Sequence, residues 1–367
     1  MHRIRDSLLS PSPKGFPYIG ELDSISHDQQ DVRLSLARGE FEEVRGAAFY
    51  NRTGISGDGV DSLEGYTRDI WYSYFQLSLH ASPETPEHDR LVLDILRIQG
   101  MGPLTRPVRG HFGIDIARMT EGTVWNDLSF LVTDMTDFWI NNCGPLSGTQ
   151  RLNFASYLAK LASTRVCKDR MCQVALIIFR CTFVERKELR TNEDKDEENP
   201  RRSMWSLNIM YLLPAAHAWL KEASHNLMQL SEVSWNDCPS KIGHGGPCFL
   251  DSELGKRSPT GFTPWRWMYW LKRLHEIREA AKDASEKHLE ELATEAIEFM
   301  SSGAQELNSD IVMVFKTAGP LIYEDKHLLP LKKLAEGEEP FPPHFLDSDE
   351  SEEGEGTKKP EEINHGN

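Results

Sequence analysis

One loop of this sequence, residues 237–261, contains side chains that could bind a metal ion. Cys238, His244 and Cys248 are spaced as C-x5-H-x3-C, and Asp251 follows them. Thiolate, imidazole and carboxylate groups are the ligands that Zn²⁺ prefers, and a structural site uses four of them. The paired C-x2-C spacing of such sites is missing, however. We therefore expect an ordinary irregular loop, with no metal and no cofactor.

A second group of side chains that could do chemistry is acidic. Asp127, Asp134 and Asp137 lie in the segment WNDLSFLVTDMTD, and helical isoprenoid enzymes use aspartates on facing helices to hold Mg²⁺. On a helix Asp127 and Asp134 would share a face, because they are seven residues apart. No DDxxD motif is present, and this face adjoins an apolar stripe. We therefore expect a solvated acidic surface rather than a metal site.

Histidine and cysteine side chains provide the remaining candidates. His217 lies in PAAHAWL, where a general base would need a carboxylate partner such as Glu222 or one from another helix. A hydrogen-bonded histidine of the core is the simpler interpretation, and Cys167, Cys172 and Cys181 fit small core residues. Nucleotide-binding glycine motifs and hydrolase motifs are absent from the sequence. The sequence therefore names no catalytic residue.

The elements that must position these side chains are helices, because apolar residues recur at helical spacing through most of the chain. Pro214 lies inside the helix predicted over 203–230, and it predicts a kink or two abutting helices there. Gly303 predicts the end of the helix over 286–301. No alternating pattern typical of a strand runs longer than four residues. The fold class is therefore all-α, a multi-helix bundle or helical array. The predicted helices are 40–50, 68–81, 85–100, 124–142, 149–163, 169–189, 203–230, 264–283, 286–301 and 304–316.

Composition divides the chain into one folded domain and two ends. Residues 1–33 are polar, contain several Pro and Ser, and are predicted to be disordered. A single all-helical domain is expected over 34–320, with an acidic surface loop at 191–202 and the irregular loop described above. Residues 337–367 form an acidic tail with too little apolar surface to offset the entropy of ordering it.

The overall charge argues against two classes of partner. With a net charge of −16, the chain lacks the clustered cations that bind phosphate backbones, so nucleic acid is not an expected partner. The same charge would repel an anionic membrane. The longest apolar run, VALIIF at 174–179, is far shorter than the roughly 20 residues that span a bilayer. Without a secretory signal, we expect a soluble cytoplasmic or nuclear protein with reduced cysteines.

The most unusual segment is GFTPWRWMYWLKRLHEI, which begins at residue 261. Thr263 is a favourable N-cap and Pro264 a favourable first residue, so a helix should begin here. One arc of that helix is an apolar core stripe, made of Trp267, Trp270, Leu271, Leu274, Ile277 and Ala281. Trp265 and Tyr269 lie on the opposite side. They either pack under the preceding loop or form an exposed interaction surface.

Nucleic-acid stacking on this helix is not expected. Its basic side chains, Arg266 and Arg273 among them, are balanced by Glu276 and Glu279 and by the negative charge of the whole chain. A membrane anchor is not expected either, because interfacial helices favour polar faces rich in Lys and Arg.

The same segment resembles the most recognisable part of a family of uncharacterised fungal proteins, a domain of unknown function. In that family a Gly-Phe-Ser/Thr-x-x-Arg-Trp-x-x-Trp segment opens a helix. The segments DIWYSYFQLSLHASPETPEHDRLVLDILRIQ, RLNFASYLAKLAS and LLPAAHAWLKEASHNL also resemble family helices, although Arg151 stands where the family usually has Trp. The resemblance covers roughly residues 34–301. It implies an all-helical intracellular domain and brings no catalytic residues.

Two functions remain open on this reasoning. The leading hypothesis is a non-enzymatic helical scaffold that binds another protein, with Trp265 and Tyr269 as its candidate interaction surface. The alternative is a helical enzyme or binding protein for an apolar small molecule, of the kind found in fungal specialised metabolism. Small apolar pockets leave no sequence signature, so the sequence does not decide between the two.

Overall fold

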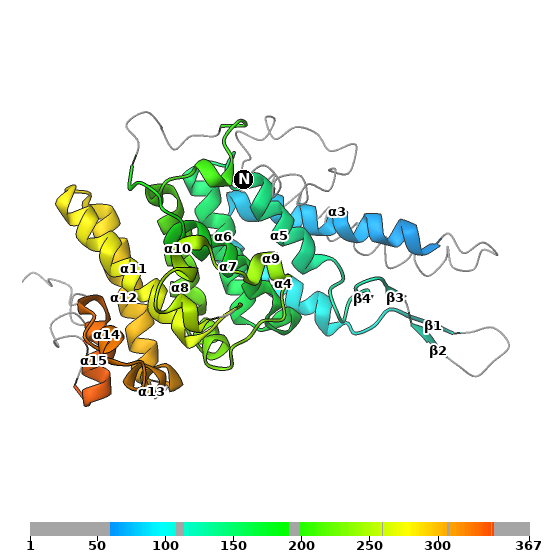
Figure 1. The fold of residues 1–367 in the computed structure, drawn as a ribbon. Coiled ribbons are helices and arrows are strands. Elements are labelled where there is room, and N and C mark those ends of the chain that lie inside the picture. The colour runs from blue at the N-terminus through cyan, green and yellow to red at the C-terminus, as the bar shows by residue number, and fades with distance from the viewer. Residues whose placement is uncertain are drawn as a thin grey trace, which may run out of the picture.

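Helices build almost all of the structure, a computed structural model that describes residues 59–107, 114–116, 118–190, 199–258, 260–306, 309–338 and 340. The predicted all-α class is confirmed (Figure 1). The predicted short helix at 40–50, the N-terminal segment 1–33 and the tail from residue 341 onward lie outside the described residues.

The described residues form long helices, short helical turns and two small hairpins. The α-helices are α3 Gly59–His80, α4 Pro86–Gly100, α5 Leu131–Asn142, α6 Gly148–Ser163, α7 Gln173–Phe179, α8 Ile209–Glu232, α9 Ser240–Gly243, α10 Pro247–Leu250, α11 Pro264–Asp283, α12 Lys287–Glu306, α13 Asp310–Lys316, α14 Pro320–Tyr323 and α15 Leu329–Glu336. The other helical turns are η2 Val166–Cys172, η3 Arg180–Val184, η4 Met204–Ser206, η5 Gly255–Arg257 and η6 Lys326–Leu328. The antiparallel pairs are β1 Thr105–Pro107 with β2 Ile114–Ile116, and β3 Arg118–Met119 with β4 Gly122–Thr123.

Helix α8 is the centre of the bundle. It packs against α6, which in turn packs against α3 and α4, and it also packs against α12 and α11 (Figure 1). Helices α13 and α15 then pack beside α11 and α12, where Leu331 is fully buried. The packed helices therefore continue beyond residue 320, where the sequence placed the end of the domain. No described helix is both long and apolar enough to cross a bilayer.

Several predicted helix boundaries are wrong. Helix α3 begins at Gly59 rather than 68, α8 begins at Ile209 rather than 203, and the predicted helix 169–189 is divided into η2, α7 and η3. Helix α5 begins at Leu131 rather than near 124, because Leu128 and Phe130 adopt left-handed backbone conformations (φ 48° and 68°) just before it. Helix α8 runs through Pro214 as one helix, so the predicted pair of abutting helices is wrong. Helix α12 continues past Gly303. A Cβ at Gly303 would lie 2.7 Å from Cε of Met228 on α8, the flexible end of that side chain.

Buried arginines hold the turn between α5 and α6. Arg151 donates hydrogen bonds to the carbonyl oxygens of Cys143 (2.9 Å) and Leu146 (2.7 Å). Arg202 donates to those of Gly144 and Leu146, both at 2.7 Å. Both side chains are buried, although the sequence placed residue 202 in a surface loop. Buried carbonyl groups need donors, and the guanidinium groups supply them.

The close approach at Gly144 gives a stability prediction. A Cβ at this position would lie 2.5 Å from the carbonyl oxygen of Arg202, and backbone atoms cannot move as cheaply as a flexible side chain. We expect Gly144→Ala to lower the free energy of unfolding by about 2 kcal/mol or more. Gly100→Ala is the matched control, because open space surrounds Gly100 at the end of α4. We expect that change to be neutral or to stabilise by less than about 1 kcal/mol. Urea denaturation measures both, and equal midpoints for the two variants would contradict the prediction.

Candidate functional site

Helix α11 begins where the sequence predicts and buries the predicted stripe. The Thr263 hydroxyl accepts a hydrogen bond from the backbone N–H of Arg266 (3.1 Å), which caps the helix. Trp270 makes edge-to-face contacts with Phe179 and Phe262, with ring centroids 4.8 and 5.8 Å away. The six predicted stripe residues are all at most 2% exposed. The helix is therefore anchored in the core along one side.

Arg266 is the residue of this helix that sequence reasoning missed. Its guanidinium is fully buried and donates hydrogen bonds to the carbonyl oxygens of Gly243 (2.6 Å) and Gly261 (3.0 Å). It also lies over the rings of Phe249 and Trp270, 5.5 and 5.7 Å from their centroids. Burial lowers the pKa of the Arg266 guanidinium to about 10, so it stays charged at neutral pH. Arg266 thus joins the two ends of the loop 243–261, and it is not one of the solvent-facing basic residues that the sequence suggested.

The loop held by Arg266 covers the predicted pair Trp265 and Tyr269 unequally. Tyr269 is only 6% exposed, and the Phe249 ring packs against it edge to face at 4.9 Å. Burial raises the pKa of the Tyr269 hydroxyl to about 12. Packing under the loop is therefore the arrangement found for Tyr269. Trp265 keeps part of its surface open, and the Arg257 guanidinium lies over its ring at 4.9 Å.

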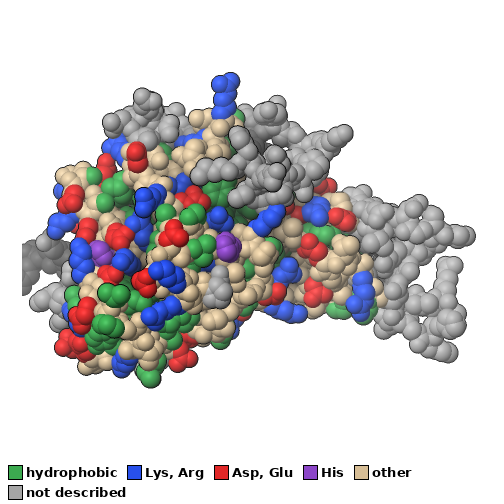
Figure 2. Space-filling view, in the orientation of Figure 1, with side chains coloured by type: hydrophobic (Ala, Val, Ile, Leu, Met, Phe, Trp, Pro, Cys, Tyr) green, Lys and Arg blue, Asp and Glu red, His purple; other side chains and the backbone are tan. Residues whose placement is uncertain are grey.

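The surface beside Trp265 extends onto α14. A Cβ built on Gly319 would lie 4.0 Å from Arg257 Nη2, so the guanidinium reaches the turn that precedes this helix. Leu321 follows two residues later and is 80% exposed. We call Trp265, Arg257 and Leu321 the α11–α14 surface. Figure 2 shows apolar side chains interspersed with charged ones on this C-terminal part of the molecule.

The possible metal ligands of the covering loop do not come together. Cys238 precedes α9, His244 follows it, and Cys248 lies in α10. Among the residues that the structure describes, no group of three or more His, Cys, Asp and Glu side chains is placed to hold a metal ion. Burial raises the pKa of the Cys238 thiol, which disfavours the thiolate that metals bind.

The cysteines predicted to be core residues are core residues. Cys167, Cys172 and Cys181 are all buried, and burial raises the pKa of each thiol above its ordinary value. Raised pKa values make these thiols poor nucleophiles at neutral pH. Their role is packing.

The three aspartates do not form the solvated face predicted for them. Asp127 lies before α5 and accepts hydrogen bonds from the backbone N–H (2.8 Å) and hydroxyl (2.7 Å) of Thr123, which lower its pKa. Asp134 is buried at 5% exposure and pairs with Arg68 of α3. Asp127 and Asp137 are exposed, as predicted, and only Asp134 of the three is buried. The prediction was wrong for Asp134 because α3 covers that side of α5, which a single helix pattern cannot show.

His217 is a hydrogen-bonded residue at the junction of α8 and α12, as predicted for a core histidine. Its Nε2 lies 2.7 Å from Oε2 of Glu295, so the carboxylate partner comes from another helix and is not Glu222. Burial lowers the pKa of His217, although the Glu295 hydrogen bond opposes this shift. The Phe299 ring packs beside it at 5.7 Å. The pair joins two helices of the core.

Comparison with known proteins supports the resemblance seen in the sequence. Residues 71–274 match the family described as "Protein of unknown function (DUF3632)". The chain belongs to this family. It is also 54% identical over 362 residues to "Oxopyrrolidines biosynthesis cluster protein G" of Penicillium oxalicum, an alignment that covers 97% of this chain and 98% of that protein. No solved structure matches this chain.

The first prediction from this site concerns Arg266. We expect Arg266→Met to lower the free energy of unfolding by about 3 kcal/mol or more, because the buried carbonyl oxygen of Gly261 loses its Arg266 donor and that of Gly243 keeps only the backbone N–H of Gly261. Arg90→Met is the matched control, since the Arg90 side chain is 57% exposed and, among the described residues, pairs only with Glu87 of its own helix. We expect that control to change stability by less than about 1 kcal/mol. Similar urea midpoints for the two variants would show that the buried bonds of Arg266 do not stabilise the fold.

The second prediction concerns Asp134. Burial raises the pKa of its carboxyl to about 7, against the opposing effect of Arg68. Between pH 5 and pH 8 the folded protein therefore binds more protons here than the unfolded chain, so its stability falls as pH rises. We expect wild type to lose about 2 kcal/mol or more relative to Asp134→Asn over this range. Asp251→Asn, at an exposed position, is the control. Parallel pH profiles for wild type and Asp134→Asn would exclude this proton uptake.

Proposed function

We propose that this protein takes part in specialised-metabolite biosynthesis as a non-enzymatic helical protein that binds another protein. The place in metabolism is supported by the relative from Penicillium oxalicum, whose name refers to a cluster for the biosynthesis of oxopyrrolidines. The mode of action is supported by the α11–α14 surface.

The composition of this surface suits a protein partner. Tryptophan and arginine are enriched among the residues that supply most of the binding energy in protein interfaces. Leu321 exposes 80% of its surface, and Trp265 is stacked against Arg257 and so held in one orientation. A preorganised side chain loses less entropy when a partner binds.

Charge narrows the chemistry of the partner. Arg257 is exposed and pairs with no carboxylate among the described residues, whereas neighbouring Lys256 pairs with Glu253 at 2.5 Å. A partner segment with one apolar side chain for Leu321 and one carboxylate for Arg257 would complement this surface. The exposed Leu321, two residues after the turn that the Arg257 guanidinium reaches, is the observation that carries the proposal.

The proposal predicts the effect of two leucine substitutions. We expect Leu321→Glu to abolish co-purification of the partner from cultures that make the metabolite, because it places a carboxylate where an apolar side chain binds. Leu93→Glu is the matched control, since Leu93 of α4 is also exposed, at 47%, in another part of the molecule. Quantitative mass spectrometry of tagged protein compares the two, and circular dichroism confirms that both fold.

Two results would contradict the proposal. One is a set of co-purified proteins that Leu321→Glu and Leu93→Glu retain equally. The other is normal metabolite production after deletion of the gene, which would remove the protein from the pathway altogether.

A further inference from the structure

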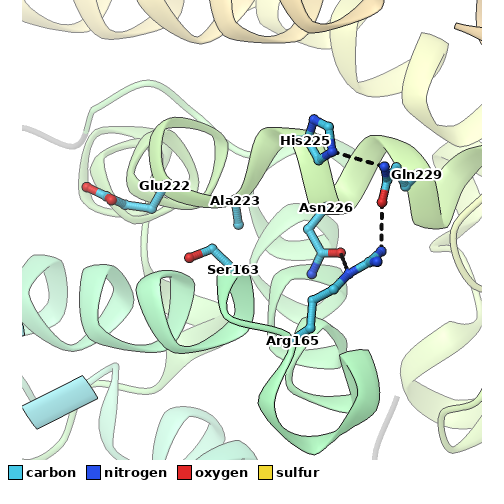
Figure 3. A pocket seen from close by; sticks show the side chains of 7 residues that line it. All are labelled: Ser163, Arg165, Glu222, Ala223, His225, Asn226 and Gln229. Carbon is cyan, nitrogen blue, oxygen red and sulfur yellow. Dashed lines mark hydrogen bonds between the residues drawn. The ribbon is translucent and has the colours of Figure 1, made fainter. Parts of the chain in front are cut away.

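A polar pocket that none of the preceding arguments uses lies between the end of α6 and the middle of α8 (Figure 3). Its volume is about 210 Å³, close to that of about seven molecules of liquid water. Ala223 is small and leaves the space open. The lining residues are Ser163, Arg165, Glu222, Ala223, His225, Asn226 and Gln229.

Arg165 is held in place by neutral groups. Its Nε donates to Oδ1 of Asn226 (3.0 Å) and its Nη2 donates to Oε1 of Gln229 (2.7 Å) (Figure 3). These two bonds occupy one edge of the guanidinium. Nη1 makes no hydrogen bond to any described residue, and the side chain is 52% exposed. One donor group of a fixed cation therefore remains for a ligand.

The amide groups that hold Arg165 are themselves fixed in orientation. Asn226 Nδ2 donates to the carbonyl oxygen of Ala162 (3.1 Å), so its Oδ1 must face Arg165. Gln229 gives its oxygen to Arg165, so its Nε2 donates to Nε2 of His225 at 2.9 Å. His225 is consequently the acceptor in that bond and carries its proton on Nδ1. This side of the pocket has a fixed pattern of donors and acceptors before any ligand binds.

Acidic groups compensate the Arg165 charge only in part. Asp169 Oδ1 lies 3.4 Å from Nε, the atom already bonded to Asn226, and this contact leaves Nη1 open. Asp169 does not line the pocket, whereas the carboxylate of Glu222 does. Glu222 precedes Gln229 by seven residues, which is about two turns of α8. The pocket therefore has a cationic end at Arg165 and an acidic end at Glu222.

The backbone beside the pocket is strained. Arg165, Cys167, Lys168 and Asp169 all adopt positive φ angles, between 53° and 66°. Left-handed backbone is unfavourable for residues other than glycine, and such residues cluster at functional sites. The strain turns the chain immediately after α6, where Arg165 enters the pocket.

We propose that this pocket binds a carboxylate-bearing small molecule of about the size of an amino acid, with its carboxylate on Nη1 of Arg165. Guanidinium–carboxylate hydrogen bonds are charge-assisted and short, and the fixed amides spare the arginine the entropy of being ordered. The site is separate from the α11–α14 surface, so it stands whether or not that surface binds a protein.

Calorimetric titration of the full chain tests the proposal with two pairs of probes. Each pair compares a carboxylate with its uncharged amide: pyroglutamate with pyroglutamide, and acetate with acetamide. We expect at least one carboxylate to bind about tenfold or more tightly than its amide, because the amide loses the charge-assisted bond. Binding that is equal within both pairs, or no binding by either carboxylate at about 10 mM, would overturn the proposal.

Substitutions then locate the binding. We expect Arg165→Gln to weaken carboxylate binding about tenfold or more. Lys168→Gln is the matched control, because it removes an exposed cation from the same strained turn and Lys168 does not line the pocket. We expect the affinity of Lys168→Gln for the carboxylate to stay within about twofold of the wild-type value. Equal losses for the two variants would overturn the site. If Arg165→Gln fails to fold, the affinities of the wild-type protein for each carboxylate and its amide still test whether a carboxylate is bound.

Discussion

The buried guanidinium of Arg266 is the interaction on which the C-terminal half of this structure depends. It bridges the carbonyl oxygens of Gly243 and Gly261 and lies between the rings of Phe249 and Trp270. No carboxylate of the described residues pairs with it. A buried cation costs much free energy unless it is well bonded, so the loop and the helix stabilise each other only when both are in place.

Buried arginines also donate hydrogen bonds to loop carbonyl oxygens at the other end of the bundle. Irregular backbone leaves carbonyl oxygens without helical partners, and arginine offers five donors on one rigid group. Arg151 and Arg202 serve the turn between α5 and α6 as Arg266 serves the loop over α11. In this family member long loops are therefore parts of the core. Surfaces built on them, including the α11–α14 surface, have a fixed shape.

Much of the fold could be predicted from local patterns. The start of α11, its Thr263 cap and its apolar stripe follow from residue types and helical period, and the structure confirms all three. The family also follows from that segment. Each of these features depends only on residues within one short stretch of the chain, so the sequence of that stretch is enough to predict it.

The features that could not be predicted depend on a second element. Arg266 lies four residues before Trp270 and so on the side of the stripe, but an arginine is placed on the surface unless the loop carbonyls that receive it are known. Asp134 is covered by α3 and pairs with Arg68 of that helix. The α11–α14 surface likewise joins residues more than fifty positions apart in the chain. Each needs tertiary contacts that helical period does not encode.

Hydrogen–deuterium exchange of the full chain tests most directly whether the loop over α11 is part of the core. The backbone N–H of Gly261 bonds to the carbonyl oxygen of Gly243 (2.9 Å), and that of Phe262 bonds to Trp235 (2.8 Å). We predict that these amides exchange as slowly as those inside α11, because both open only on global unfolding. Exchange at the rate of an unstructured peptide across 237–261 would contradict this account.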